Sequence, residues 1–213
     1  MFAGNVIYKI KKMFKASKYD KLYPDRDMEI RFLLKYLRGK TVLDIGGGTG
    51  FISQALNSEG FMCWSVEPQK EMVEISRQKG VDTVCSTAEK MELDIGFDNA
   101  IMMFNVFNFL EDPDKALNNI SKLLKGRLIF TYYNQSKKVK GWQFNWKLKR
   151  LSRKKWFGNR VEIDFWFPFW HEHHTMRVYS DKHILKLLKK HGFKIVKRIK
   201  EKYTTNIVAK NAN

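Results

Sequence analysis

Asp44, Gly46, Gly48 and Gly50 occupy alternate positions and form the segment of this sequence best suited to hold a ligand. Glycines let the backbone approach a ligand closely and adopt torsion angles that other residues avoid. The apolar residues before Asp44 are typical of a buried strand. The segment from Phe51 is typical of a helix, whose first N–H groups lack backbone partners. The sequence therefore predicts a strand, a ligand-binding turn and a helix, with an acid at the edge of the turn.

Two phosphate-binding motifs that also use glycine-rich turns do not fit this segment. A P-loop carries Lys-Ser or Lys-Thr after its last glycine, and Phe51-Ile52 stand there instead. A dinucleotide fingerprint needs a third glycine at the position of Phe51. Asp44 would in addition repel a pyrophosphate. Nucleoside triphosphates and dinucleotides are therefore both disfavoured as ligands.

The spacing from Asp44 to Gly50 resembles motif I of the class I S-adenosylmethionine-dependent methyltransferases. The ligand of that family carries a sulfonium and an ammonium group but no phosphate, so an acid beside the turn suits it. The resemblance implies that Asp44 orients the amino acid moiety while the glycines lie against the ligand. It also implies that Glu67, at the end of the next expected strand, accepts hydrogen bonds from both ribose hydroxyls.

Two further segments resemble the family. Thr87-Ala88-Glu89 stands where many members have Asp-Ala-Glu, whose Asp faces the adenine amino group, so Thr87 is a departure from the pattern. Asn105 follows the fourth expected strand, in a loop that in the family faces both cofactor and acceptor. The resemblance covers about residues 39–134 and, more loosely, 180–210. It predicts S-adenosyl-L-methionine as the cofactor, bound by Asp44, Gly46, Gly48, Gly50, Glu67, Thr87, Ala88, Glu89 and Asn105.

Apolar strands and amphipathic helices alternate along the chain, which is typical of an α/β fold with a parallel sheet covered on both faces. The expected helices span 27–37, 51–59, 69–79, 112–124 and 181–191, and the expected strands span 41–45, 61–67, 83–85, 97–104, 127–133, 193–198 and 204–209. The family resemblance implies a Rossmann-like, doubly wound, seven-stranded sheet of order 3-2-1-4-5-7-6, with strand seven antiparallel.

We expect residues 1–38 to form an N-terminal helical extension and residues 39–213 to form one methyltransferase domain with a basic aromatic cap at 135–175. Within the extension, residues 2–15 have the spacing of a short basic amphipathic helix, which either packs on the domain or binds a lipid or nucleic acid surface. Residues 135–160 hold ten basic residues and no acidic one, interleaved with aromatic residues. Regular structure is expected to resume only at Ser180.

The cap also holds the histidine candidates for catalysis. A nucleophile that carries a proton needs a base, and imidazole titrates near neutral pH. In an extended segment His171 and His173 share a face, and we expect one of them to be that base. Alternating side chains of one strand rarely complete a coordination sphere, so we expect no metal site. Asn105 and Asn108 are alternatives that would position a nucleophile through hydrogen bonds, with Asn105 preferred.

Composition bounds the partners and the location. The net charge of +18 favours polyanions or an anionic membrane surface, or else reflects solvated lysines. Cys63 and Cys85 lie in short apolar stretches, typical of reduced thiols in core strands. No apolar run approaches the roughly 20 residues of a membrane-spanning helix. We therefore expect a cytoplasmic protein, with peripheral contact to an anionic membrane as an additional location.

Three functions remain open. The first is methyl transfer to a small or lipid-like acceptor, which suits aromatic walls with a cationic rim. The second is methylation of RNA, including tRNA, because the basic cap could contact phosphates and its aromatic residues could stack on unpaired bases. The third is a cofactor-binding partner subunit without catalysis. The presence of Asp44, the spaced glycines and Glu67 argues against the third.

Overall fold

The computed structural model describes residues 20, 26–134, 141–145, 150–157, 159–167 and 170–212. For residues 141–145, 150–152, 156, 165–167 and 170–172 only the backbone is described. The helix expected over residues 2–15 lies outside the described residues.

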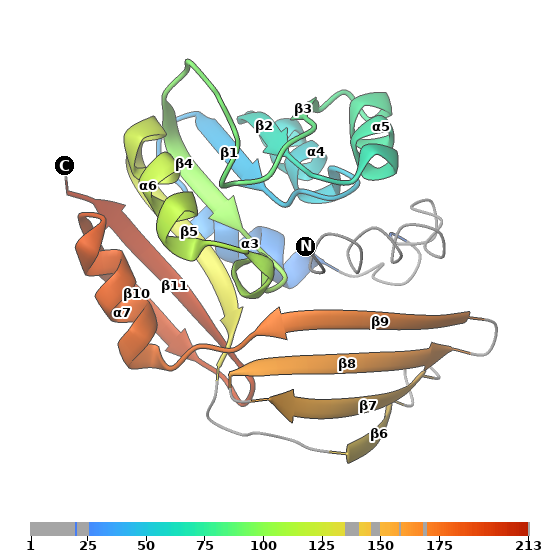
Figure 1. Cartoon of the computed structure of the whole chain (residues 1–213). Helices are drawn as coiled ribbons and strands as arrows, with labels where there is room; N and C mark the ends of the chain where they lie inside the picture. The colour runs from blue at the N-terminus through green and yellow to red at the C-terminus, as the bar shows by residue number, and fades with distance from the viewer. Residues whose placement is uncertain are drawn as a thin grey trace.

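One mixed sheet forms the centre of the molecule (Figure 1). Its strands are β1 (Thr41–Ile45), β2 (Met62–Val66), β3 (Asp82–Val84), β4 (Phe97–Met102), β5 (Leu124–Tyr133), β10 (Phe193–Lys200) and β11 (Thr204–Asn211). Their order is β10-β11-β5-β4-β1-β2-β3. Strands β1 to β5 pair in parallel, and β11 is antiparallel to both β5 and β10. The predicted α/β fold, strand order and antiparallel seventh strand are therefore confirmed.

Helices cover both faces of this sheet, and neighbouring residues of β1 show how the faces divide. Val42 packs in a core with Leu33 of α3 (Asp27–Tyr36) and Ile52 of α4 (Phe51–Ser58). Leu43 points to the other face, into a core with Leu117 of α6 (Pro113–Leu123) and with residues of α7 (Asp181–Lys190). Successive side chains of a strand point to opposite faces, so one apolar strand supplies both cores. Helix α5 (Lys70–Gln78) follows β2.

Two helix starts form as their sequences indicate. The Asp112 carboxylate accepts a hydrogen bond from the Lys115 N–H at the start of α6, where Pro113 occupies the first turn. The Ser180 hydroxyl accepts one from the His183 N–H at the start of α7. Each cap satisfies an N–H that the helix itself leaves unpaired.

A second sheet, here called the cap sheet, lies between β5 and α7 in the sequence. It comprises β6 (Gly141–Asn145), β7 (Arg150–Phe157), β8 (Arg160–Phe167) and β9 (Trp170–Arg177), in that order and all antiparallel. It lies beyond the carboxyl end of β5 (Figure 1). A small apolar cluster joins the two sheets: Tyr133, Val161, Ile163, Met176 and Val178, with Tyr203 packed against it.

The expectation that regular structure resumes only at Ser180 is therefore wrong. The signal was present in β8, where Val161 and Ile163 are buried and alternate with Glu162 and Asp164 on the opposite face. Such alternation is typical of a half-buried strand. The density of lysine, arginine and tryptophan around it obscured the pattern.

The two cysteines differ. Cys63 is buried in β2 and Cys85 is exposed, one residue beyond β3, and both thiols are free. The expectation that both lie in core strands therefore holds for Cys63 only. In the part of the chain that the structure describes, no helix is long and apolar enough to cross a membrane.

Candidate cofactor site

The glycine turn connects β1 to α4, and no described side chain covers its central glycine. Gly46, Gly48 and Gly50 have φ angles of 70°, 59° and 73°, a region that side chains disfavour. A Cβ atom added to Gly46 would come within 2.7 Å of the Val106 side chain, so this glycine allows the turn to pack against the loop after β4. A Cβ atom on Gly48 would meet no atom of the described residues within 4 Å. None of the residues that the structure describes therefore blocks a ligand from approaching the backbone at Gly48.

Glu67 is joined to this turn by a hydrogen bond. Its Oε2 accepts the Gly48 N–H at 3.0 Å, and its Oε1 accepts the Gln69 N–H at 2.9 Å. Burial raises the pKa of the Glu67 carboxyl, and these two hydrogen bonds oppose the rise. Each carboxylate oxygen can accept more than one hydrogen bond. Glu67 could therefore bind two vicinal hydroxyls while it holds the turn.

Asp44 is 3% exposed and accepts a hydrogen bond from the Ser53 hydroxyl, which lies 2.7 Å from Oδ2. Burial raises the pKa of Asp44 to about 6, against the lowering effects of the Ser53 hydrogen bond and the Arg26 charge. The Asp44 charge in turn raises the pKa of Glu67. Two buried carboxylates of like charge are stabilised by a cationic ligand. A ligand with an ammonium and a sulfonium group, but no phosphate, fits this electrostatic environment.

Arg26 places a cation beside this site, and it is not among the residues that the sequence indicated. Its guanidinium is almost fully buried, with its Cζ atom 4.6 Å from the centroid of the Phe51 ring and 5.1 Å from that of Phe104. It also lies 3.6 Å from Oδ1 of Asp20, whose Oδ1 accepts a hydrogen bond from the Thr49 hydroxyl in the glycine turn. A lone arginine ahead of a helix has no sequence pattern that marks it as part of a site.

The loop after β4 carries backbone strain. Phe104 and Asn105 have φ angles of 54° and 63°, and Asn105 begins the short helix η2 (Val106–Phe109). Two consecutive side-chain-bearing residues in this region cost about 1–3 kcal/mol each. The Oδ1 atom of Asn105 is buried and has no hydrogen-bond partner among the described residues. Strain together with an unsatisfied carbonyl is typical of a ligand-binding position, and the role of Asn105 stays a prediction.

Asn108 has a different place from Asn105. It is 1% exposed, and its amide binds backbone on both sides: Oδ1 accepts the Tyr133 N–H at 2.7 Å, and Nδ2 donates to the carbonyls of Tyr133 and Arg177 at 3.2 and 2.6 Å. These hydrogen bonds join η2 to the end of β5 and the end of β9. Asn108 therefore anchors the cap sheet rather than facing a ligand.

The Thr87-Ala88-Glu89 segment forms the turn after β3. The Thr87 carbonyl accepts from the N–H groups of Lys90 and Met91. Oε1 of Glu89 accepts from the N–H groups of Glu111 and Asp112 at 2.9 and 3.3 Å, ahead of α6. Glu89 thus connects this turn to the loop after β4. The structure gives it this supporting contact, and its contact with a cofactor stays a prediction, as do those of Thr87 and Ala88.

The two predicted histidines lie in β9, and only one has a described side chain. The side chain of His171 lies outside the described residues. The Nδ1 atom of His173 lies 2.8 Å from Oδ1 of Asp164, its direct partner on β8. An acid at Nδ1 fixes the orientation and tautomer of the ring. Asp164 was not predicted as a site residue, because its pairing with His173 depends on the strand register of the cap sheet, which the sequence did not indicate.

Comparisons with known proteins identify the family. A family profile described as "Methyltransferase domain" matches residues 22–198. The chain belongs to this methyltransferase family. The predictions of a class I methyltransferase and of S-adenosylmethionine as its cofactor are confirmed at the level of the family.

Individual relatives are distant. The chain is 26% identical over 111 residues to a ubiquinone biosynthesis O-methyltransferase of Coxiella burnetii, covering 48% of this chain and 47% of the relative. It thus spans about half the length of the curated relatives that it matches. Among solved structures, an S-adenosylmethionine-dependent methyltransferase from Clostridium acetobutylicum has a TM-score of 0.71 and 20% identity, covering 100% of this chain and 98% of that one.

A second solved structure carries the cofactor. CalS10, an amino pentose methyltransferase from Micromonospora echinaspora with S-adenosylmethionine bound, has a TM-score of 0.71 and 15% identity, covering 99% of this chain and 97% of that one. At these identities the two structures establish a common fold over nearly the whole chain.

Proposed function

We propose that this chain transfers the methyl group of S-adenosylmethionine to a small or lipid-like acceptor. The observation that carries the proposal is the turn at Gly48. No described residue covers one side of this turn, and the Gly48 N–H donates a hydrogen bond to the buried carboxylate of Glu67. Asp44, close enough to raise the pKa of Glu67, adds the charge that an ammonium group needs. The relatives support the acceptor class, because ubiquinone biosynthesis and an amino pentose both involve small or lipid-like molecules.

Methyl transfer requires mainly that the acceptor nucleophile is aligned with the methyl group of the cofactor. The cofactor supplies a methyl group already activated by a sulfonium, so holding the nucleophile in line contributes several kcal/mol. Asp44, Glu67 and the Gly48 backbone would hold the two ends of the cofactor. Asn105, in its strained conformation beside the turn, would orient the acceptor through its side-chain carbonyl oxygen, which has no hydrogen-bond partner among the described residues.

A proton must leave the acceptor when the nucleophile is a hydroxyl or a protonated amine. In the proposal His173 accepts that proton, and Asp164 stabilises the resulting imidazolium at Nδ1. Both side chains lie on the cap-sheet face opposite to Val161 and Ile163, so the proposal requires the acceptor to reach this face of β9. His171 is the alternative base. A cytoplasmic location and peripheral contact with an anionic membrane are parts of the proposal, whereas contact with RNA belongs to the alternative function.

One experiment tests the acceptor class. Cell extract is separated into lipid, RNA and small-molecule pools, and each is incubated with the protein and cofactor labelled in its methyl group. We expect label in the lipid or small-molecule pool, and much less with a Glu67→Gln variant prepared in parallel at a cofactor concentration that saturates only the wild type. Label confined to RNA would contradict the proposal in favour of the RNA alternative. No label in any pool, with cofactor binding intact by calorimetry, would favour the non-catalytic subunit.

A further inference from the structure

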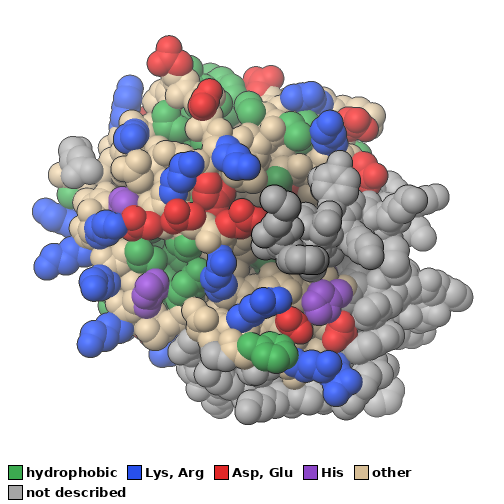
Figure 2. All heavy atoms as spheres, viewed as in Figure 1, with side chains coloured by type: hydrophobic (Ala, Val, Ile, Leu, Met, Phe, Trp, Pro, Cys, Tyr) green, Lys and Arg blue, Asp and Glu red, His purple; other side chains and the backbone are tan. Residues whose placement is uncertain are grey.

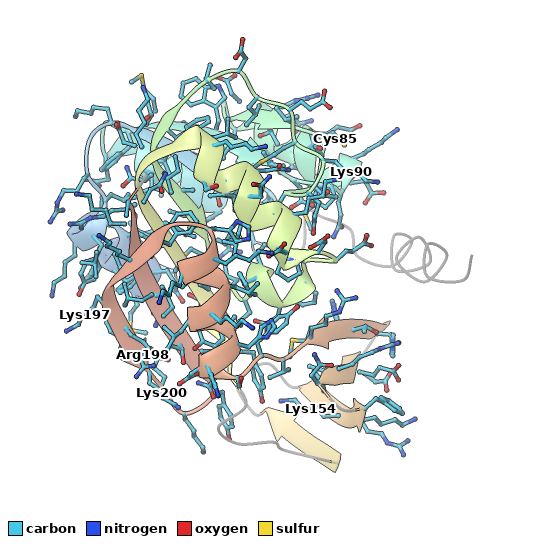
Figure 3. The ribbon with its side chains drawn as sticks, turned by 60° about the vertical axis from the view of Figure 1, so that its left-hand side comes forward. Cys85, Lys90, Lys154, Lys197, Arg198 and Lys200 are labelled. Atoms are coloured by element: carbon cyan, nitrogen blue, oxygen red, sulfur yellow. The ribbon has the colours of Figure 1, made fainter. Side chains whose placement is uncertain are left out.

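The edge strand β10 carries an exposed mixture of basic and apolar side chains, here called the β10 patch. It consists of Lys194, Ile195, Val196, Lys197, Arg198 and Lys200, all exposed. Ile195 and Val196 are 39% and 49% exposed, and they rank among the large hydrophobic side chains most open to solvent in the described chain. Figure 3 shows Lys197, Arg198 and Lys200 following one another along this strand.

The surroundings of the patch share its charge. Residues 181–202, which include α7 and β10, hold nine lysines and arginines against the two acids Asp181 and Glu201. Asp181 is within 4 Å of both Arg198 and Lys200. Lysine and arginine side chains gather at the edge of the molecule where α7 and β10 lie (Figure 2). This edge therefore carries a large share of the positive charge of the chain.

Lysines on an edge strand also serve to prevent pairing with another sheet. That function does not account for Ile195 and Val196, which make the edge more apolar. The register of β10 against β11 shifts between Ile195 and Lys197, which leaves Val196 as the extra residue of a β-bulge. The bulge interrupts the alternation and exposes two successive apolar side chains between Lys194 and Lys197.

We infer that the β10 patch docks this protein on an anionic membrane surface. Cations attract the headgroups of anionic lipids, and short apolar side chains between them enter the interface. The segment from Lys194 to Lys200 contains no aromatic residue, so it lacks the stacking contacts with which proteins bind unpaired RNA bases. An anionic bilayer fits this combination better than a nucleic acid does.

The position of the patch connects docking to the proposed active site. The carboxyl end of β10 leads to Tyr203, which stacks on Tyr133 at a centroid distance of 6.3 Å. Tyr133 ends β5 and belongs to the apolar cluster on which the cap sheet rests. A membrane against β10 would therefore lie close to the base of the cap sheet. This part of the inference rests on the proposed lipid-like acceptor, whereas the docking itself does not.

Sedimentation with vesicles tests the inference without any methyl transfer. The full chain is mixed with vesicles of phosphatidylcholine and phosphatidylglycerol, and with vesicles of phosphatidylcholine alone. We expect binding to the anionic vesicles only. A Lys194→Gln/Lys197→Gln variant should partition about thirtyfold more weakly, the effect of two lysine charges near an anionic surface.

The matched control is Lys70→Gln/Lys90→Gln, which removes the same charge at the β3 end of the sheet, opposite β10. Lys90 lies far from the patch in Figure 3. This control should partition like the wild type. Equal partitioning of the Lys194/Lys197 variant and the control would overturn the inference, since the binding would then follow net charge alone.

An apolar variant separates lipid from RNA. Ile195→Ser/Val196→Ser keeps every charge and should weaken vesicle partitioning about tenfold. Calorimetry should show unchanged cofactor affinity, so a failure of docking is distinguishable from a failure of the cofactor site. Full vesicle partitioning by the apolar variant, or tighter binding of the wild type to a structured RNA than to the vesicles, would overturn the inference in favour of a polyanion site.

Discussion

The Glu67 carboxylate accepts a hydrogen bond from the Gly48 N–H at 3.0 Å, and this contact joins the end of β2 to the turn after β1. The predicted ribose-binding acid therefore also sets the shape of the glycine turn. Because one carboxylate would bind the ligand and holds the loop, replacing one of its oxygens should affect both ligand binding and the shape of the loop.

Replacement of Glu67 by Gln should weaken cofactor binding about tenfold to a hundredfold. The amide NH₂ group would face the N–H of Gly48 or of Gln69, and two donors cannot bond to each other. Isothermal titration calorimetry with S-adenosylmethionine measures the change. Glu74→Gln, at an exposed position of α5, is the matched control and should bind like the wild type. Unchanged affinity of Glu67→Gln would remove this residue from the site.

Asp44 should make the stability of the cofactor-free protein depend on pH. Its pKa rises on folding from 3.8 to about 6, so folding favours the protonated carboxyl. This stabilisation is complete below a pH of about 4 and is lost as the pH rises through about 6. Compared with Asp44→Asn, the wild type should lose about 3 kcal/mol of unfolding free energy by neutral pH.

Urea denaturation near pH 4 and near pH 7 checks this difference. Asp94→Asn, at an exposed position, should show no such pH dependence relative to the wild type. Saturating cofactor should offset the loss, because an ammonium group beside Asp44 stabilises the ionised form. If the difference in unfolding free energy between the wild type and Asp44→Asn is the same at both pH values, the raised pKa of Asp44 is contradicted.

Arg26 should support cofactor binding through its charge. Removing the guanidinium in Arg26→Met would raise the pKa of Asp44, since the Arg26 charge now lowers it. We expect the cofactor affinity near pH 6 to fall about tenfold. Arg26→Lys keeps the charge but loses the planar contact with the Phe51 and Phe104 rings, so it should recover part of the affinity. Calorimetry at several pH values measures the cofactor affinity of both variants. Equal cofactor affinities of Arg26→Met and Arg26→Lys would exclude a charge effect.

His173→Ala should lower turnover about a hundredfold and leave the cofactor dissociation constant unchanged. Asp164→Asn should give a smaller loss, because the ring keeps a hydrogen-bond partner and loses only the charge beside Nδ1. His171→Ala is measured alongside. Single-turnover assays with the acceptor from the fractionation experiment give the rates. If both histidine variants keep full activity, neither ring is the base.

Asn108→Ala should destabilise the fold by about 3 kcal/mol. The substitution leaves the backbone groups of Tyr133 and the Arg177 carbonyl buried without their amide partner. Thermal and urea unfolding measure the loss, with Asn118→Ala on α6 as a control expected to stay near the wild type. A neutral effect of Asn108→Ala would mean that other contacts fix the cap sheet.

The sequence was most informative where one chain segment determines its own structure. The buried strand before Asp44, the glycine turn and the helix caps at Asp112 and Ser180 all follow from local patterns, and the family resemblance added the strand order. The contacts of Glu89, Arg26 and Asp164 were not predictable, because each depends on a partner 9 to 22 positions away in the sequence. Such partners meet only through the register of strands or the packing of loops.

The amide of Asn108 touches the residue where the insertion leaves the main sheet, Tyr133, and the residue where it returns, Arg177. Both ends of the inserted segment are thus secured at one point of the parent domain. The segment between Tyr133 and Arg177 can therefore be replaced as a unit without moving the strands that carry Asp44 and Glu67. Grafting the equivalent insertion of a relative onto this asparagine is therefore a direct route to changing acceptor choice while cofactor recognition is retained.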